Sequence, residues 1–363
     1  MKLRKPDRFL WILLLILITT GFFIFASASL GLVGRSGQAS FYYIALKQAL
    51  ILLTGVVGMI ALSNVPYKWW RQYAIYIALG ALMVTCLVFI DQLNFTAGGA
   101  RRWINLGPLT FQPAEFLKIA IIIYLAAWMA TAKEAIQTWT GGFLPFLGIL
   151  VIPATILYLQ PNNSSIAIIA IAAFAMYWVA GAPWKQIIAF GLLGVLGLGL
   201  IISARPYVKE RVLTFLDTNR DTQGSSWQIN QSLIAVGSGH LTGRGFGQSV
   251  QKFNYLPEPM GDSIYAVAAE EFGFVGAVTL VIIFLLLALW GLKIASRIND
   301  SFGRLLAVGI VILITSQSFI NISAMLGLVP LTGVPLLFVS QGGTALLVAL
   351  LEAGLLLNLS RYQ

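Results

Sequence analysis

Four carboxylates are concentrated between Asn254 and Phe274, where a polar segment leads into a long apolar run. Glu258 and Asp262 come just before the apolar run, and Glu270 and Glu271 lie inside it. A carboxylate in or beside an apolar membrane helix is costly, so it marks a functional site by default. The stretch is therefore the first place in this sequence to look for chemistry.

Asp262 has the best position of the four acids for catalysis. It follows Met260 and Gly261 at the start of an expected helix, where Asp is also favoured as an N-cap for purely structural reasons. At a membrane face, near several Arg and Lys residues, the same carboxylate could act as a general base. Glu270 and Glu271 are neighbours on a helix and cannot both face one way. We expect at least one of them to pair with a residue of another span, or with a buried cation, in a structural role.

Two groups of basic residues could hold an anion near these acids. Lys118 follows Glu115 by three residues, so the two share a helix face. They form either an internal ion pair or part of a cavity in which Lys118 binds phosphate. Arg101 and its neighbours lie in residues 92–113, whose glycines and prolines forbid a continuous helix. This segment is either an interfacial loop anchored by Trp103 or a site for an anionic headgroup.

Two further polar stretches could line a site. Residues 237–247 are rich in glycine, which lets backbone amides approach an anion while Arg244 supplies charge; a flexible loop is the alternative. Ser340, Gln341 and Thr344 place polar atoms near the start of the last apolar helix. They serve either tight helix packing or the lining of a cavity.

The elements that must position these residues are membrane helices. Hydrophobic residues make up 58% of the chain and charged residues 10%, against about 25% charged in soluble proteins. Apolar runs of bilayer length predict an all-α, polytopic membrane protein with about ten helices in one domain over residues 1–363. The expected spans are 9–30, 44–63, 72–91, 114–131, 143–160, 163–181, 184–203, 263–292, 304–326 and 335–359.

The distribution of charge predicts the orientation. The net charge of +10 is scattered over short loops, which indicates membrane orientation and no nucleic-acid partner. An even number of spans with a basic N-terminal side puts both termini in the cytoplasm and the long loop, 204–262, outside. A single cysteine, Cys86, and a single histidine, His240, argue against a disulfide framework and a His-based metal centre.

Several ordered motifs together resemble the SEDS family, the polytopic peptidoglycan polymerases typified by FtsW and RodA. The resemblance covers nearly the whole chain and is slightly closer to FtsW. Its motifs lie at 25–29, 99–104, 112–118, 231–239, 256–258, 262, 270–273 and 330–335. The match departs from the family's pattern at 160–165, where an expected acid is replaced by asparagine, at Gly261, and at Gln341.

The resemblance implies glycan polymerisation from lipid II on the outer face of the bacterial cytoplasmic membrane. Asp262 matches the family's essential acid, Glu115 and Lys118 its buried charged pair, and Arg101 its outer-loop arginine. Asp262 would remove the proton of the attacking acceptor hydroxyl. Undecaprenyl diphosphate would leave, its charge balanced by Lys118, Arg101, Arg244 or a divalent cation such as Mg or Mn. Glu258, Glu271 and Ser340 would support the site.

The resemblance also implies partners and leaves rival functions open. Class B penicillin-binding proteins and other membrane proteins of the division or elongation machinery are the expected partners. A lipid II flippase would need polar residues at mid-membrane, and a non-catalytic scaffold would not need Asp262 as a base. The sequence places most polar clusters at one face, which favours an enzyme acting there.

Overall fold

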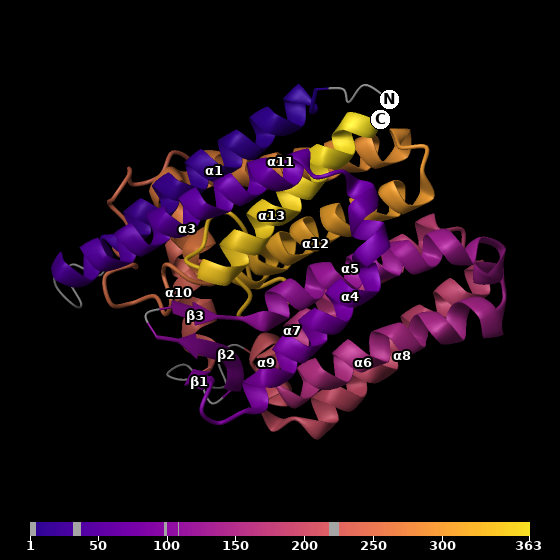
Figure 1. The fold of residues 1–363 in the computed structure, drawn as a ribbon. Coiled ribbons are helices and arrows are strands. Elements are labelled where there is room, and N and C mark those ends of the chain that lie inside the picture. The colour runs from indigo at the N-terminus through magenta and orange to yellow at the C-terminus, as the bar shows by residue number, and fades with distance from the viewer. Residues whose placement is uncertain (1–4, 32–37, 98–99, 108, 218–224) are drawn as a thin grey trace.

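The structure, a computed structural model, describes residues 5–31, 38–97, 100–107, 109–217 and 225–363. Ten apolar helices form a bundle of roughly parallel rods (Figure 1). They are α1 (Arg8–Ser29), α3 (Gln38–Asn64), α4 (Tyr67–Cys86), α5 (Pro113–Ala132), α6 (Leu144–Leu159), α7 (Asn163–Val179), α8 (Trp184–Ala204), α11 (Ile264–Arg297), α12 (Ser301–Met325) and α13 (Gly343–Leu359). Within the described residues, nine helices are long and apolar enough to cross a membrane, and α7, with 17 residues, is shorter. The predicted polytopic helical fold is confirmed.

The helices differ in how much protein surrounds them. The apolar stretches of α12 and α13 are 78% and 83% buried inside the protein, whereas that of α8 is 6% buried. A helix that is apolar all round and exposed to its surroundings is typical of contact with lipid. The core therefore lies along α12, α13 and α5, and α8 lies at the rim of the bundle.

The two ends of the bundle carry different features. Both termini lie together at one end, where the Asp7 amide donates to Ser360 Oγ at 3.0 Å and Gln363 Nε2 donates to Asp7 Oδ2 at 3.3 Å. The strands and the helices of the long loop lie at the opposite end (Figure 1). This end is called the loop end below. Chain ends on one side agree with the expected even number of crossings.

A small antiparallel sheet stands where the sequence predicted an irregular loop. Strands β1 (Asn94–Ala97), β2 (Ala100–Leu106) and β3 (Leu109–Phe111) pair in that order. In β2 Ile104 is buried and its neighbours Trp103 and Asn105 are more exposed, as in a strand with one covered face, and Gly107 turns with a φ of 75°. The prediction that no continuous helix crosses this segment is confirmed, and its strands, which the sequence analysis did not predict, form a small sheet.

Several helix boundaries differ from the predicted ones: α3 begins at Gln38 and not near 44, α4 spans Tyr67–Cys86 and not 72–91, and α11 ends at Arg297 and not near 292. The last helix begins at Gly343 and not near 335, because residues 326–342 form a non-helical segment with turns and with positive φ at Gly327, Gly333 and Phe338. The long loop is partly helical and contains α9 (Pro206–Leu216) and α10 (Ser225–Ser238). Short helices also follow three of the long ones: η1 (Leu87–Phe89), η2 (Lys133–Gln137) with η3 (Trp139–Phe143), and η4 (Ser360–Tyr362).

Helix α11 is interrupted near the loop end. Gly273 has φ 66° and ψ −166°, which no helix allows. The amides of Phe274 and Val275, freed by this break, donate to the carbonyls of His240 and Leu241 at 2.9 and 3.2 Å. A Cβ on Gly243 would lie 2.1 Å from the Glu271 carbonyl oxygen, so the two backbones touch only because glycine is there.

The same contact explains the glycine-rich run 237–247. The amides of Arg244 and Gly245 donate to the carbonyls of Glu270 and Glu271, each at 3.0 Å. These two amides are therefore used to hold the loop against the break in α11. The sequence had offered an anion cradle or a flexible loop for this run, and the structure shows close backbone packing.

Candidate active site

Asp262 lies at the loop end, immediately before Ser263, the N-cap residue of α11. The expectation that Asp262 caps this helix was wrong, because its carboxylate is turned toward α10. Gln228 Nε2 donates to Asp262 Oδ1 at 3.1 Å and to Ser263 Oγ at 3.0 Å. Asn321 of α12 donates to the Asp262 backbone carbonyl at 2.7 Å and to that of Val334 at 2.8 Å. Two helices thus fix the residue from opposite sides.

The surroundings raise the pKa of Asp262. Burial is the largest cause and, with a smaller contribution from the negative charge of Glu258, raises the pKa to about 6 against the hydrogen bond from Gln228 and the charge of Arg211. The carboxylate is half-buried and precedes the membrane helix. A carboxyl group with a pKa near neutrality is well suited to accept a proton from an attacking hydroxyl.

Glu258 lies in the turn that leads to Asp262. Its φ is 44°, and its carbonyl accepts hydrogen bonds from the amides of Gly261 at 2.9 Å and Ser263 at 3.3 Å. The turn brings the two acids close enough for their charges to interact. The structure therefore places Glu258 beside Asp262, as the sequence analysis had it.

The segment 326–342 packs against this turn. Ser340 Oγ donates to the Gly261 carbonyl at 2.7 Å and accepts from the Leu336 amide at 2.8 Å. The Gln341 amide donates to the Met260 carbonyl at 2.7 Å. Ser340 thus supports the backbone next to Asp262, and its hydroxyl is directed at protein groups.

Arg211 is a member of the site that sequence reasoning did not select. It lies on α9, and its Nη1 donates to the Leu331 carbonyl at 2.8 Å while its guanidinium lies 4.6 Å from the centre of the Tyr207 ring. A Cβ on Gly333 would lie 3.8 Å from both Arg211 Nη2 and Asp262 Oδ2. The only sequence signal was a basic α9 segment, which carries no information about its distance from Asp262. Gln228 and Asn321, the residues that hold Asp262, were also missed, because their positions in the sequence carry no information about their distance from Asp262.

Glu115 and Lys118 form the predicted ion pair, with 2.9 Å between Oε2 and Nζ. Both side chains are buried, and Lys118 also donates to Gln317 Oε1 of α12. Glu352 of α13 lies close enough for its charge to interact with both. Lys118 is therefore buried and engaged by protein groups, and within the described residues no ion pair or hydrogen bond joins it to Asp262.

Arg101 and Arg102 lie on strand β2. Arg101 forms an ion pair with Asp91 at 2.7 Å, and both side chains are more than half exposed. Arg102 donates to the carbonyl of Pro161, in the stretch that departs from the family pattern. Within the part of the chain that the structure describes, no ion pair or hydrogen bond joins Arg101 to Asp262.

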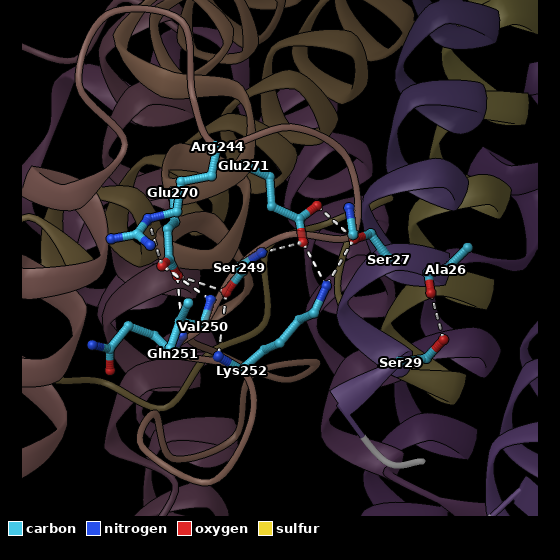
Figure 2. A network of polar contacts seen from close by, with 11 residues as sticks. Ala26, Ser27, Ser29, Arg244, Ser249, Val250, Gln251, Lys252, Glu270 and Glu271 are labelled. Atoms are coloured by element: carbon cyan, nitrogen blue, oxygen red, sulfur yellow. Dashed lines mark hydrogen bonds and ion pairs between the residues drawn. The ribbon is translucent and has the colours of Figure 1, made fainter. Parts of the chain in front are cut away.

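A second, fully buried network joins α1, the long loop and α11 (Figure 2). Lys252 Nζ lies 2.7 Å from Glu271 Oε1 and donates to Ser27 Oγ at 3.3 Å. Ser27 of α1 in turn donates to the other oxygen of Glu271. The prediction that one of the adjacent acids pairs with a buried cation is confirmed for Glu271.

Glu270 holds the same loop segment through a different set of contacts. Its carboxylate accepts from Ser249 Oγ at 2.6 Å, from the Val250 amide at 3.1 Å and from the Gln251 amide at 3.3 Å. Arg244 Nε lies 3.3 Å from its Oε1 (Figure 2). Arg244, an expected anion-binding residue, is thus paired with a protein carboxylate.

The described residues contain no group of three or more His, Cys, Asp or Glu side chains arranged to hold a metal ion. Asp262 and Glu258 are a pair of neighbouring carboxylates. One or two carboxylates, completed by substrate phosphates and water, are the usual protein contribution to a magnesium site.

Known proteins are similar in sequence to this chain over nearly its whole length. The family model described as cell cycle protein, covering FtsW, RodA and SpoVE, matches residues 7–363. Stage V sporulation protein E of Bacillus subtilis is 38% identical over 99% of this chain and 98% of its own length. A probable peptidoglycan glycosyltransferase FtsW of Idiomarina loihiensis is 36% identical over 97% of this chain and 86% of its own.

Solved structures show the same fold. One, described as the structural coordination of polymerization and crosslinking by a peptidoglycan synthase complex, has a TM-score of 0.80, 25% identity and 99% coverage of both chains. The rod shape determining protein RodA of Thermus thermophilus has a TM-score of 0.71 and 23% identity over 99% of this chain and 98% of its own.

Proposed function

Because the chain belongs to the cell cycle protein family of FtsW, RodA and SpoVE, known as SEDS proteins, we propose that it is a peptidoglycan glycosyltransferase that polymerises lipid II. One observation carries the choice of site. Asp262 is a half-buried carboxylate at the loop end, held by Gln228, with its pKa raised to about 6 by burial and by Glu258. It is the acid of the loop end best suited to exchange a proton near neutral pH.

The proposed reaction forms one glycosidic bond and breaks one. The 4-hydroxyl oxygen of the acceptor sugar attacks the anomeric carbon of the donor, and Asp262 takes the hydroxyl proton. The bond from the anomeric carbon to the diphosphate oxygen breaks, and undecaprenyl diphosphate leaves with the electron pair. A diphosphate is stable as an anion, so this exchange requires a base and cations but no acid to protonate the leaving group.

The negative charge of the leaving group must be balanced. Lys118 and Arg244, two of the cations selected from the sequence, are paired with Glu115 and Glu270. A divalent cation that arrives with the diphosphate would supply positive charge to its oxygens. Arg101 stays a candidate, since its ion pair with Asp91 is exposed and exchanges readily.

The proposed setting is the outer face of the bacterial cytoplasmic membrane. From the Lys and Arg of the short loops we infer that both termini are cytoplasmic, and the two termini lie at one end of the bundle, as this inference requires. The loop end, with Asp262, would then face outward, where lipid-linked sugars are polymerised. The structural likeness to a chain of a peptidoglycan synthase complex supports a class B penicillin-binding protein as partner, with other division or elongation proteins around it.

A lipid II flippase is the rival proposal, and one observation bears on it. The cluster of Glu115, Lys118 and Glu352 is buried among α5, α12 and α13. A transport site at mid-membrane has polar side chains that face a water-filled path. Here the charges face one another, which favours an enzyme at the loop end.

The test is polymerisation of lipid II by purified protein, alone and with its penicillin-binding partner. We expect Asp262→Asn to lower the rate by about 10²–10⁴-fold, the usual contribution of a general base. The variant should keep the elution volume and helical content of the wild type. Polymerisation by the folded variant at the wild-type rate would refute the assignment of Asp262, and transport of lipid II across vesicles without polymerisation would favour the flippase.

A further inference from the structure

We propose that Arg211 binds the diphosphate of the polyprenyl-linked sugar beside Asp262, an inference that rests on the proposed glycosyltransferase function. The anion-binding cations predicted from the sequence, Arg101, Lys118 and Arg244, lie in other parts of the chain. In the structure Arg211 of α9, which was not predicted as a site residue, lies near the catalytic acid.

Arg211 is held in place by two contacts. Its Nη1 donates to the Leu331 carbonyl, and its guanidinium carbon lies 4.6 Å from the centre of the Tyr207 ring. A guanidinium has five N–H donors, and among the residues that the structure describes Arg211 forms no other hydrogen bond. Across the described ranges no carboxylate forms an ion pair with Arg211. A fixed, half-buried guanidinium of this kind is suited to bind phosphate through two parallel hydrogen bonds.

Gly333 lies beside both this cation and the catalytic acid. A Cβ at that position would touch both Arg211 Nη2 and Asp262 Oδ2, each at 3.8 Å. Gly333 is exposed and has a φ of 67°, a conformation that disfavours a side chain there. Asp262 and Arg211 therefore adjoin the same exposed glycine without forming an ion pair. From this position an acceptor hydroxyl can approach the acid while a departing diphosphate approaches the cation.

The other candidate cations are engaged by protein carboxylates. Lys118 pairs with a buried glutamate, Arg244 with Glu270, and Lys252 with Glu271. Lys209 lies on the same helix as Arg211 but is exposed. Lys209 therefore provides a matched control, because its replacement removes the same charge from α9 without removing the guanidinium beside Asp262.

The test measures binding, not turnover. Farnesyl diphosphate and farnesyl monophosphate are titrated into the detergent-solubilised full chain, with phosphatidylglycerol as a competitor. We expect Arg211→Gln to weaken diphosphate binding by about 10–100-fold, as the loss of charge-assisted hydrogen bonds predicts. Lys209→Gln should bind as the wild type does. Equal binding by Arg211→Gln and the wild type, an equal loss in Lys209→Gln, or full competition by phosphatidylglycerol would each overturn the proposal.

Arg211→Lys covers the case in which Arg211→Gln does not fold. Lysine keeps the charge and can still reach the Leu331 carbonyl, but it cannot make two parallel bonds to a diphosphate. The preference for diphosphate over monophosphate should fall at least about threefold in this variant. An unchanged preference would contradict the proposal.

Asp262→Asn separates this inference from the proposed function. It should bind farnesyl diphosphate at least as tightly as the wild type, because a negative charge beside the site is gone. If the wild type does not polymerise lipid II but its diphosphate binding depends on Arg211, the proposed function fails and the binding site stands. If Asp262→Asn stops polymerisation and Arg211→Gln neither binds less tightly nor slows it, only the role of Arg211 fails.

Discussion

Glu271 and Asp262 lie on the same stretch of chain, yet their carboxylates have opposite surroundings. Glu271 is fully buried, and its two oxygens are matched by Lys252, Ser27 and a backbone amide (Figure 2). Asp262 is half-buried, receives one side-chain hydrogen bond, and has no ion pair among the described residues. The first arrangement satisfies a charge completely, and the second leaves it short of partners.

This difference separates a structural from a reactive carboxylate. A buried charge that is paired and hydrogen-bonded stays ionised and holds elements together. A carboxylate that is enclosed without enough partners has a raised pKa, and raised pKa values are concentrated at functional sites. The Glu271 network also anchors the loop that ends at Asp262, so this network helps to position Asp262.

The largest effect on stability should come from removing one partner of the buried ion pair between Lys252 and Glu271. Lys252→Met would leave Glu271 buried without its counter-charge, which costs about 3–5 kcal/mol of folding free energy. Thermal unfolding in detergent, followed by tryptophan fluorescence, should show a clearly lower melting temperature. The double variant Lys252→Met with Glu271→Met should recover most of the loss, because replacing both partners by apolar side chains is often neutral. A single variant as stable as the wild type would show that the pair does not anchor the loop.

Removing the charge of Asp262 should have the opposite effect and stabilise the protein. The pKa of Asp262 rises from 3.8 to about 6 on folding, so between those values the folded state binds more protons and stability falls as pH rises. Above about pH 6 Asp262 is ionised in both the folded and the unfolded state, so the full cost of its charge lowers the free energy of unfolding. Asp262→Asn removes it and should stabilise the protein by about 1–2 kcal/mol at pH 7.5, less than the full shift because the residue is half-buried. The gain should vanish near pH 4. A loss of stability at pH 7.5 would show that the charge of Asp262 does not destabilise the folded state.

The two regions were not equally predictable from sequence. Apolar runs located all ten helices, and the cost of membrane carboxylates singled out Asp262, Glu270 and Glu271, because both signals are local. Lys252 and Gln228 carry no such signal. They meet their acids only through the path of the long loop, which hydropathy does not determine.

The pH dependence of the reaction tests whether Asp262 is the base. The base must be ionised, so kcat/KM should fall about tenfold per pH unit below about pH 6. Gln228→Leu removes a hydrogen bond that lowers the pKa of Asp262, so the acid limb should move to higher pH. Glu258→Gln removes a charge that raises this pKa, so the limb should move to lower pH. At pH 5.5 the two variants should differ from the wild type by about two- to threefold in opposite directions, unless another group titrates in their place.

The smallest effect is expected at the exposed pair of Arg101 and Asp91 on the strand side of the loop end. Arg101→Gln should change the free energy of unfolding by at most about 0.5 kcal/mol, and less at high salt, because the pair is screened by water. Asp91→Asn is the matched control, since it breaks the same pair but keeps the guanidinium. If the pair is only local, the two variants should polymerise lipid II equally well. If Arg101 binds the diphosphate, only Arg101→Gln should slow polymerisation, because only that variant removes the cation, and the stability of both variants would still match.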